Sequence, residues 1–327
     1  MCGIFAYAGT ENAAPLLIEG LRTVEYRGYD SAGISVIHHS GAIQTVKCGD
    51  HKASLENLAG SLKDGQLQGV VGIGHTRWAT HGEVNQKNSH PHFSSDHAVS
   101  IAHNGIIENF LELKDELEDT GIEFQSDTDS EVLAHLVGKA VAKGSSLREA
   151  VSSAAIRIKG NTAVVAVSMV EPGTVVGMRV GNAGGIVIGK NEEAAVMASD
   201  TIALLPFTSE VIYLEPGEVV EIEQGVIRLF DLEGTTIDRE PVTTGQNFEA
   251  AQKGNHPHFM SKEIAEQPDA VQAALRGRAD FVKGTLSLPE ISLTHDQITS
   301  IDRVVLTGMG TSLHTAMFGA NLIESLA

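Results

Sequence analysis

The sequence has little of what several classes of protein require. Its 2 cysteines, at positions 2 and 48 of 327, cannot build a multi-disulfide scaffold. It has 23 basic residues against 42 acidic ones, a net charge of 23 − 42 = −19, and no basic cluster longer than a pair. Such a charge repels a phosphate backbone. No apolar run approaches the roughly 18 residues of a membrane-spanning helix, and the first basic residue is Arg22, too late for a secretory signal. We expect a cytoplasmic protein without nucleic-acid or membrane partners.

The chain does have enough apolar residues, 42%, for a sizeable core. At about 150 residues per domain, its length predicts two domains. Apolar periodicity and turn residues predict strands at 3–8, 32–37, 42–47, 70–75, 98–103, 162–167, 174–180 and 218–222, and helices at 13–26, 146–158 and 261–276. Thr128 and Glu131 form a capping-box pattern, which predicts that another helix starts there.

The composition changes after Asp231. Residues 232–257 are rich in glycine and proline and poor in apolar residues, which indicates an interdomain linker. The helix expected after them is interrupted by Pro268. An apolar strand at 303–307, a glycine-containing loop and a final helix then suggest the beginning of a βαβ unit.

Cys2 is the sharpest chemical feature. If Met1 is removed, residue 2 presents a thiol and an α-amino group together, and an amine with a pKa of about 7.7–8.0 can act as a base at neutral pH. This is the chemistry of an N-terminal nucleophile. The alternative is an unreactive thiol at a frayed chain end, although a strand at 3–8 would hold it rigidly. Cys48, at a strand end, is better explained as a structural residue.

The segment from Gly74 to Gly82 follows an apolar strand and contains the only tryptophan. Arg77 offers a planar guanidinium suited to a carboxylate, and Trp78 can form the wall of a pocket. The alternative is ordinary surface packing of an Arg–Trp pair. The small and hydroxyl residues around the pair leave both interpretations open.

Six of the 14 histidines lie between positions 75 and 103. Their spacing fits no zinc template, so we expect no metal site. Asn104 and Gly105 are either a simple turn or a pair of donors for an oxyanion. Asp127 and Asp129 most simply belong to a helix cap, but the same carboxylates could face the ammonium group of a ligand.

Together these segments resemble a known family. They are 1–4, 25–33, 75–82, 90–92, 103–109 and 126–131, followed by 198–200, 262–268 and 308–312. They are similar to the glutaminase half, and the start of the sugar isomerase (SIS) half, of the glutamine:fructose-6-phosphate aminotransferases, which are also called glucosamine-6-phosphate synthases. Met-Cys-Gly-Ile alone marks all class II glutamine amidotransferases, whereas Tyr-Arg-Gly-Tyr-Asp and Lys-Glu-Ile are specific to this family.

The resemblance implies an α+β fold: an αββα N-terminal-nucleophile domain, followed by the first strand and helix of an α/β SIS domain. It places the class II glutamine amidotransferase domain at 1–240, a linker and helical segment at 241–300, and the truncated start of the SIS domain at 301–327. It also implies a homo-oligomer formed through the SIS half where that half is complete.

The resemblance further implies hydrolysis of L-glutamine to glutamate and ammonia without a cofactor. Cys2 would be the nucleophile and its α-amine the base, with Asn104 and Gly105 as the oxyanion hole. The roles in substrate binding would fall to Arg77 for the α-carboxylate, Asp129 for the α-ammonium, and Trp78, Thr80 and His81 for the shape of the pocket. Thr311 and Ser312 would remain from a phosphosugar site.

Two departures from the family pattern affect the expectation. Met309 occupies a position where the family usually has Cys, and the chain stops one helix into the first SIS subdomain. We therefore expect glutaminase activity without synthesis of glucosamine 6-phosphate from fructose 6-phosphate, which needs a complete SIS half. One alternative is another class II amidotransferase, such as amidophosphoribosyltransferase, which would lack the Lys-Glu-Ile motif. The other is a silent glutamine-binding module, which would have lost Cys2, Arg77 or Asp129.

Overall fold

The computed structural model describes residues 2–49, 54–62, 67–79, 82–182, 185–245, 255–280, 282–287, 292–308 and 310–326. The chain divides into two compact units, Met1–Gly254 and Asn255–Ala327. Within the described ranges, no helix combines the length and the apolar character needed to cross a membrane.

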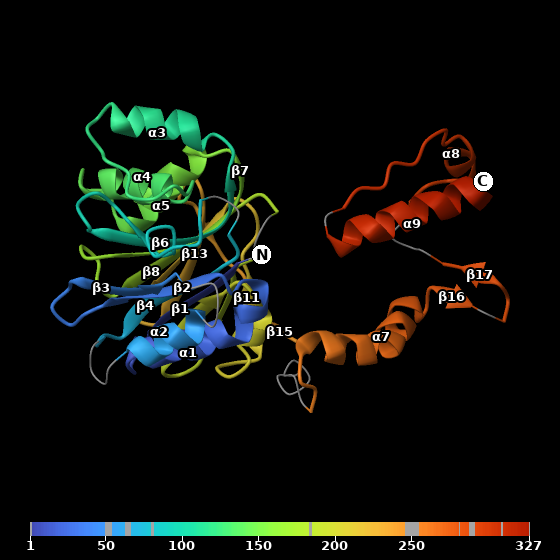
Figure 1. Ribbon diagram of the computed structural model, residues 1–327, viewed down its shortest axis with the longest axis horizontal. Helices are drawn as coiled ribbons and strands as arrows, with labels where there is room; N and C mark the ends of the chain where they lie inside the picture. Colours follow the sequence, from blue (N-terminus) through green and yellow to red (C-terminus); the bar gives the residue numbers. More distant parts are fainter. Residues whose placement is uncertain are drawn as a thin grey trace. The chain divides into compact units, whose positions relative to one another are not determined.

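Two antiparallel β-sheets form the centre of the first unit (Figure 1). Among the described residues, the first sheet has the strand order β15-β11-β9-β10-β1-β4-β2-β3, and the second has the order β14-β13-β12-β8-β7-β6-β5. The first sheet consists of β1 (Gly3–Gly9), β2 (Ser31–Ile37), β3 (Ile43–Cys48), β4 (Val71–Arg77), β9 (Val187–Lys190), β10 (Ala194–Ala198), β11 (Glu210–Tyr213) and β15 (Val242–Thr243). The second consists of β5 (His92–Phe93), β6 (Val99–Ile107), β7 (Gly160–Ser168), β8 (Thr174–Val180), β12 (Glu218–Glu223), β13 (Val226–Asp231) and β14 (Thr236–Ile237).

Helices cover the outer face of each sheet (Figure 1). On the first sheet these are α1 (Ala13–Val24) and α2 (Ser54–Ser61); on the second they are α4 (Glu131–Val141) and α5 (Leu147–Arg157), with α3 (Phe110–Glu118) packed on α4. Among the described residues, the first unit also has two short 3-10 turns, η1 (Glu25–Arg27) and η2 (Thr201–Ala203). The four layers have the order α-β-β-α, as the resemblance predicts.

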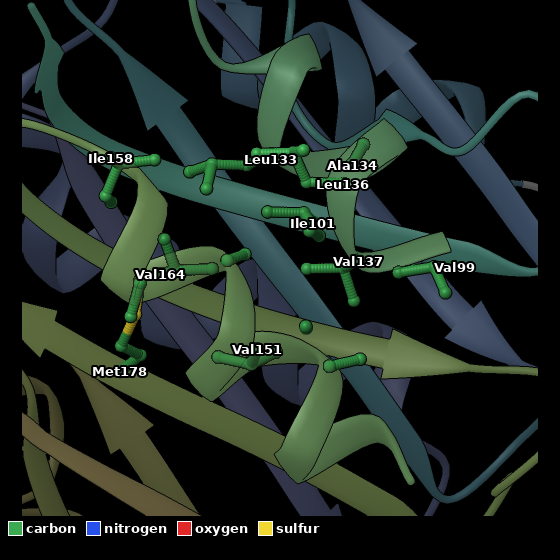
Figure 2. Packing of buried hydrophobic residues seen from close by; sticks show 14 of the residues in the cluster. Val99, Ile101, Leu133, Ala134, Leu136, Val137, Val151, Ile158, Val164 and Met178 are labelled. Carbon is green, nitrogen blue, oxygen red and sulfur yellow. The ribbon is translucent and has the colours of Figure 1, made fainter. Parts of the chain in front are cut away.

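Side chains alternate between two cores along the central strands, because successive residues of a strand point to opposite faces. In β1, Phe5 and Tyr7 pack with α1, whereas Ile4, Ala6 and Ala8 belong to the core between the two sheets. The other outer core lies between the second sheet and its helices. Figure 2 shows strand residues such as Ile101 and Val164 next to Leu133, Val137 and Val151 of the helices.

The strands expected near the N-terminus and the helix expected at 146–158 are confirmed to within a few residues. The helix expected to start near Thr128 and Glu131 is confirmed, but the capping box itself is wrong. Helix α4 begins at Glu131, and its N-cap, Ser130, makes no side-chain cap hydrogen bond. Thr128 instead contacts His92, and Glu131 accepts hydrogen bonds from residues 125 and 126. Buried tertiary partners have replaced the local cap. A true capping box joins Ser146 and Glu149 at the start of α5.

The linker predicted at 232–257 begins too early. Residues 236–237 pair with β13 as β14, and residues 242–243 pair with β11 as β15, so both belong to the sheets of the first unit. Short edge strands of this kind carry too few apolar residues to stand out from a loop in the sequence.

The second unit contains α7 (Phe259–Leu275), β16 (Ala279–Asp280), β17 (Thr285–Leu286), α8 (His295–Thr299) and α9 (Thr311–Leu326). Pro268 lies inside α7 and does not divide it, contrary to the prediction. Residues 303–307 form no strand, and the side chains of Val304, Val305 and Leu306 are exposed. A strand of this apolar type needs neighbours on both sides, and the described part of this unit offers only the β16–β17 hairpin.

Candidate active site

Cys2 lies directly before β1, which is hydrogen-bonded to β10 on one side and to β4 on the other. The pairing with β4 begins at Gly3, so the chain is held from the next residue onward and the frayed-end alternative does not apply. The Cys2 Sγ accepts a hydrogen bond from the backbone N–H of Trp78 at 3.2 Å. A backbone donor thus fixes the position of the sulfur.

The backbone carbonyl of Cys2 is held from two directions. It accepts hydrogen bonds from Asn104 Nδ2 and from Arg27 Nε, both at 3.1 Å. Arg27 in turn pairs with Asp200 at 3.3 Å, and the hydroxyl of Tyr26 donates to the same carboxylate at 2.5 Å. Sequence reasoning assigned no role to these three residues. The only signal was their place inside the motifs at 25–33 and 198–200.

Asn104 and Gly105 belong to β6 of the second sheet and are not a turn. Gly105 has φ +128°, and a Cβ there would lie 2.0 Å from the carbonyl oxygen of Asn161. Only glycine fits this position. On the other side of Asn104, His75 Nε2 lies 3.0 Å from its Oδ1 and 3.1 Å from the carbonyl oxygen of His103. The amide of Asn104 is therefore bound at both ends.

Arg77 is the last residue of β4, and its guanidinium donates to the carbonyl oxygens of Glu83, at 3.3 Å, and Gly82, at 3.5 Å. Burial lowers the pKa of Arg77, while Cys2, Asp30 and Asp129 raise it in part. Because the ordinary pKa of arginine is above 12, the group remains a cation. Trp78 is 45% exposed and meets the ring of Tyr29 edge-on at 5.6 Å.

Asp129 is buried and lies just before α4. Its Oδ2 accepts a hydrogen bond from the backbone N–H of Ile107 at 2.8 Å, and the hydroxyl of Ser130 lies 3.5 Å from Oδ1. The carboxylate therefore faces the end of β6 and does not cap the helix that follows.

These groups surround one narrow, half-open recess with a cavity volume of about 20 Å³. Its lining residues are Cys2, Arg77, Trp78, His90, His103, Gly105, Thr128, Asp129 and Ser130. The structure thus brings together five of the residues expected to bind or react with glutamine, with Asn104 adjacent through the Cys2 carbonyl. Thr80, His81 and Met309 lie outside the described residues, and Thr311 and Ser312 open α9 in the second unit.

Four of the clustered histidines are buried against one another. The rings of His75 and His90 stack at 4.1 Å, and His92 meets His90 edge-on at 4.6 Å. Burial lowers the pKa of His75 to about 3 and holds the pKa values of His90 and His92 well below the ordinary value. These rings are neutral hydrogen-bonding groups. The described residues contain no group of three or more side chains placed to hold a metal ion.

Burial also raises the pKa of the Cys2 thiol, and the hydrogen bond from Trp78 and the charges of Arg77 and Arg27 offset this only in part. The thiol therefore keeps its proton at neutral pH. A nucleophilic reaction at the sulfur needs a base that removes the proton during attack.

A larger cavity of about 750 Å³ lies elsewhere in the first unit, beside β9, β11, β13 and β14. Its lining contains no cysteine, serine or histidine. Two of its cations are already paired, Arg228 with Glu221 and Glu223, and Arg239 with Glu218. Size alone therefore does not mark the reactive site.

Comparison with known proteins agrees with the site chemistry. Residues 56–178 match the family model described as a glutamine amidotransferase domain. Over its full length the chain is 41% identical to the glutamine–fructose-6-phosphate aminotransferase (isomerizing) of Clostridium tetani and 42% identical to that of Thermus thermophilus. It covers 52% of each, so the chain spans about half the length of the curated relatives it matches. The resemblance found in the motifs is confirmed.

Two solved structures are also similar. The glutamine phosphoribosylpyrophosphate amidotransferase of B. subtilis, complexed with ADP and GMP, has a TM-score of 0.60 and 26% identity, covering 71% of this chain and 49% of its own. An allosteric regulatory enzyme of purine biosynthesis gives a TM-score of 0.61 and 27% identity with the same coverage. The fold expected for the amidotransferase part is confirmed, and the assignment of the second unit to an SIS domain stays a prediction.

Proposed function

We propose that this chain, residues 56–178 of which match the glutamine amidotransferase domain, hydrolyses L-glutamine to glutamate and ammonia with Cys2 as the nucleophile. The observation that carries the proposal is one recess lined by a thiol, a buried guanidinium and a buried carboxylate: Cys2, Arg77 and Asp129. A zwitterionic amino acid with an electrophilic side chain matches these three groups.

Before any turnover, hydrolysis of the peptide bond between Met1 and Cys2 removes Met1 and frees the α-amine of Cys2. That amine takes the thiol proton while the sulfur attacks the side-chain carboxamide carbon of glutamine. Asn104 Nδ2 and the backbone N–H of Gly105 donate to the oxyanion that forms. The protonated amine then gives its proton to the departing nitrogen, ammonia leaves, and a thioester remains on Cys2. Water hydrolyses the thioester, which releases glutamate and restores the thiol.

Substrate recognition relies on two buried charges of opposite sign. Arg77 binds the α-carboxylate of glutamine through its planar guanidinium, and Asp129 accepts hydrogen bonds from the α-ammonium. Each residue is held by backbone contacts in the structure. Trp78 shapes the open edge of the recess, and we assign the same role to Thr80 and His81.

We infer that the ammonia is destined for fructose 6-phosphate when a complete SIS half is present, giving glucosamine 6-phosphate. The names of the relatives that match the entire chain support this assignment. In that context Thr311 and Ser312, at the start of α9, contribute to a phosphosugar site, and the SIS half forms a homo-oligomer.

The second candidate is the glutaminase part of an amidophosphoribosyltransferase, because one similar structure is a glutamine phosphoribosylpyrophosphate amidotransferase and the other is an enzyme of purine biosynthesis. Their similarity covers 71% of the chain at 26–27% identity. The aminotransferases match the full chain at 38–42% identity and extend through the Lys-Glu-Ile motif. The broader match favours the aminosugar assignment.

The proposal is tested by incubating the purified chain with L-glutamine and measuring glutamate release, alongside the intact mass of the protein. Activity should accompany a mass that lacks one methionine. Cys2→Ala, compared at equal folded concentration by circular dichroism, should release no glutamate above the uncatalysed rate. Glutamate release by Cys2→Ala at the original rate would refute the nucleophile assignment.

A further inference from the structure

Glu131 has an unusual setting for the first residue of a helix. Only 3% of this residue is exposed, and its carboxylate has four polar contacts. Oε1 accepts from the backbone N–H of Gln125 at 2.7 Å and lies 3.2 Å from His135 Nε2. Oε2 accepts from both the backbone N–H and the hydroxyl of Ser126, each at 2.6 Å. Glu131 therefore holds the chain that precedes its own helix.

The carboxylate carries a negative charge in this position. Burial by itself would raise the pKa of Glu131, but the hydrogen bonds from His135, Gln125 and Ser126 lower it below the ordinary value of a glutamic acid. An ionised carboxylate can only accept hydrogen bonds. The hydroxyl proton of Ser126 must therefore point toward Glu131.

That orientation extends along the segment to the recess. Since the Ser126 hydroxyl donates to Glu131, it accepts from the hydroxyl of Thr128, 2.9 Å away. Thr128 then accepts from His92 Nε2 at 3.1 Å. The hydroxyls of Ser126 and Thr128 therefore donate in an order that the charge of Glu131 sets. Asp129 is the residue that follows Thr128.

The other side of Asp129 is held independently of Glu131. Ser130 contacts His103 Nδ1 at 2.7 Å, and the Asp129 carboxylate itself meets Ile107 N–H at 2.8 Å. Asp129 lies between these contacts and the Ser126–Thr128 segment. Loss of Glu131 would release one of the two sides and leave the other in place.

We propose that Glu131 is a positioning residue for the amino-acid site: through Ser126 and Thr128 it sets the Asp129 carboxylate at the point where the substrate α-ammonium binds. This inference rests on the proposed glutaminase function. It predicts that Glu131 affects the recognition of the α-ammonium and not the chemistry at the carboxamide.

The test compares two substrates on the full chain, L-glutamine and glutaramate, which is glutamine without its α-amino group. The measured quantity is the ratio of their kcat/KM values. Unfolding of part of the sample lowers both values equally and leaves the ratio unchanged. The variants are Glu131→Ala, Glu131→Gln, which keeps the side-chain volume, Asp129→Asn, and the double variant Glu131→Ala/Asp129→Asn.

Glu149→Ala is the matched control. Glu149 also accepts a backbone hydrogen bond beside a helix start, but it does so in the exposed capping box of α5. Its removal should leave the ratio unchanged. The control shows whether the effect of Glu131→Ala is specific to the glutamate that holds the Asp129 segment, or follows from removing any glutamate at the start of a helix.

We expect Glu131→Ala to lower the ratio about tenfold or more, mainly through the KM for glutamine, with Glu131→Gln showing a smaller loss. Once Asp129 is changed, the added Glu131→Ala substitution should lower the ratio no further. A normal ratio in Glu131→Ala or in Asp129→Asn, or additive losses in the double variant, would refute the inference. Absence of glutaminase activity in the wild-type chain would instead refute the proposed function.

Discussion

His75 Nε2 lies 3.0 Å from Asn104 Oδ1, and the two residues come from different sheets, His75 from β4 and Asn104 from β6. Since Asn104 Nδ2 donates to the Cys2 carbonyl, its Oδ1 is the acceptor that faces His75. His75 must then carry its proton on Nε2. Burial, which lowers its pKa to about 3, keeps the ring neutral with that single proton. A neutral histidine thus fixes the direction of the amide proposed for the oxyanion hole.

His75→Ala should therefore lower kcat for glutamine hydrolysis by about 10- to 100-fold, with a smaller change in KM, because the Asn104 amide loses its orienting donor. Steady-state kinetics on the folded variant measure both parameters. An unchanged kcat would show that Asn104 is oriented without His75.

Arg77→Lys should raise KM for glutamine. Lysine keeps the positive charge but loses the planar fork, and the loss of a charged hydrogen bond costs roughly 1–3 kcal/mol, or about 5- to 150-fold in kcat/KM. The value of kcat should change little. If kcat/KM for glutamine were unchanged, Arg77 would have no part in binding the α-carboxylate.

Gly105→Ala should abolish activity and lower the melting temperature. A Cβ at φ +128° would lie 2.0 Å from a backbone oxygen, which forces the backbone of β6 to move at the proposed oxyanion hole. Gly121→Ala is the control, because Gly121 also has positive φ, +87°, but has nothing within 4 Å of the added atom. That variant should lose some stability and keep its activity. Equal behaviour of the two variants would contradict the steric argument.

A chain that ends after residue 254 should retain glutaminase activity. All described members of the three hydrophobic cores, including the partly buried residues around them, lie between residues 4 and 237 of the first unit. The first unit therefore has its own cores. The measurement compares kcat/KM and melting temperature with those of the full chain. Loss of the folded state in the shortened chain would show that the second unit is needed for stability.

The buried histidines should make stability fall with decreasing pH. His75, His90 and His92 have folded-state pKa values below their ordinary value of 6.5, so between about pH 6.5 and pH 3 the unfolded chain binds more protons than the folded one. Each such histidine contributes at most about 1.4 kcal/mol per pH unit to this loss. The contribution of these neutral histidines to the free energy of unfolding is fully present above about pH 6.5. Urea unfolding at pH 7 and pH 5 should give a lower free energy of unfolding at pH 5. His90→Gln should make the difference between the two pH values smaller. An equal difference in the variant and the wild-type chain would show that His90 does not contribute.

The sequence predicts an element correctly where the pattern of neighbouring residues already reflects the contacts that the element makes in the fold. The strand after Cys2 is confirmed because its apolar residues face cores on both sides of the sheet, as a continuous apolar run requires. The capping box at Thr128 is wrong because its hydroxyl meets His92, 36 residues away, a contact that no local pattern contains. The pairing of Arg27 with Asp200 was not predicted for the same reason, because these residues are 173 positions apart in the sequence.

The pairing of β1 with β10 also bears on the order in which the site can form during synthesis. Phe5 pairs with Ala198, and the backbone N–H of Ile4 donates to Ser199. On a ribosome that makes roughly 5–20 residues per second, the strand behind the nucleophile waits on the order of ten seconds or more for this partner. Cys2 is among the first residues to emerge, but the strand directly behind it gains this partner only after residue 198 has been made. The growing chain therefore cannot hydrolyse glutamine until almost the whole of the first unit has been made.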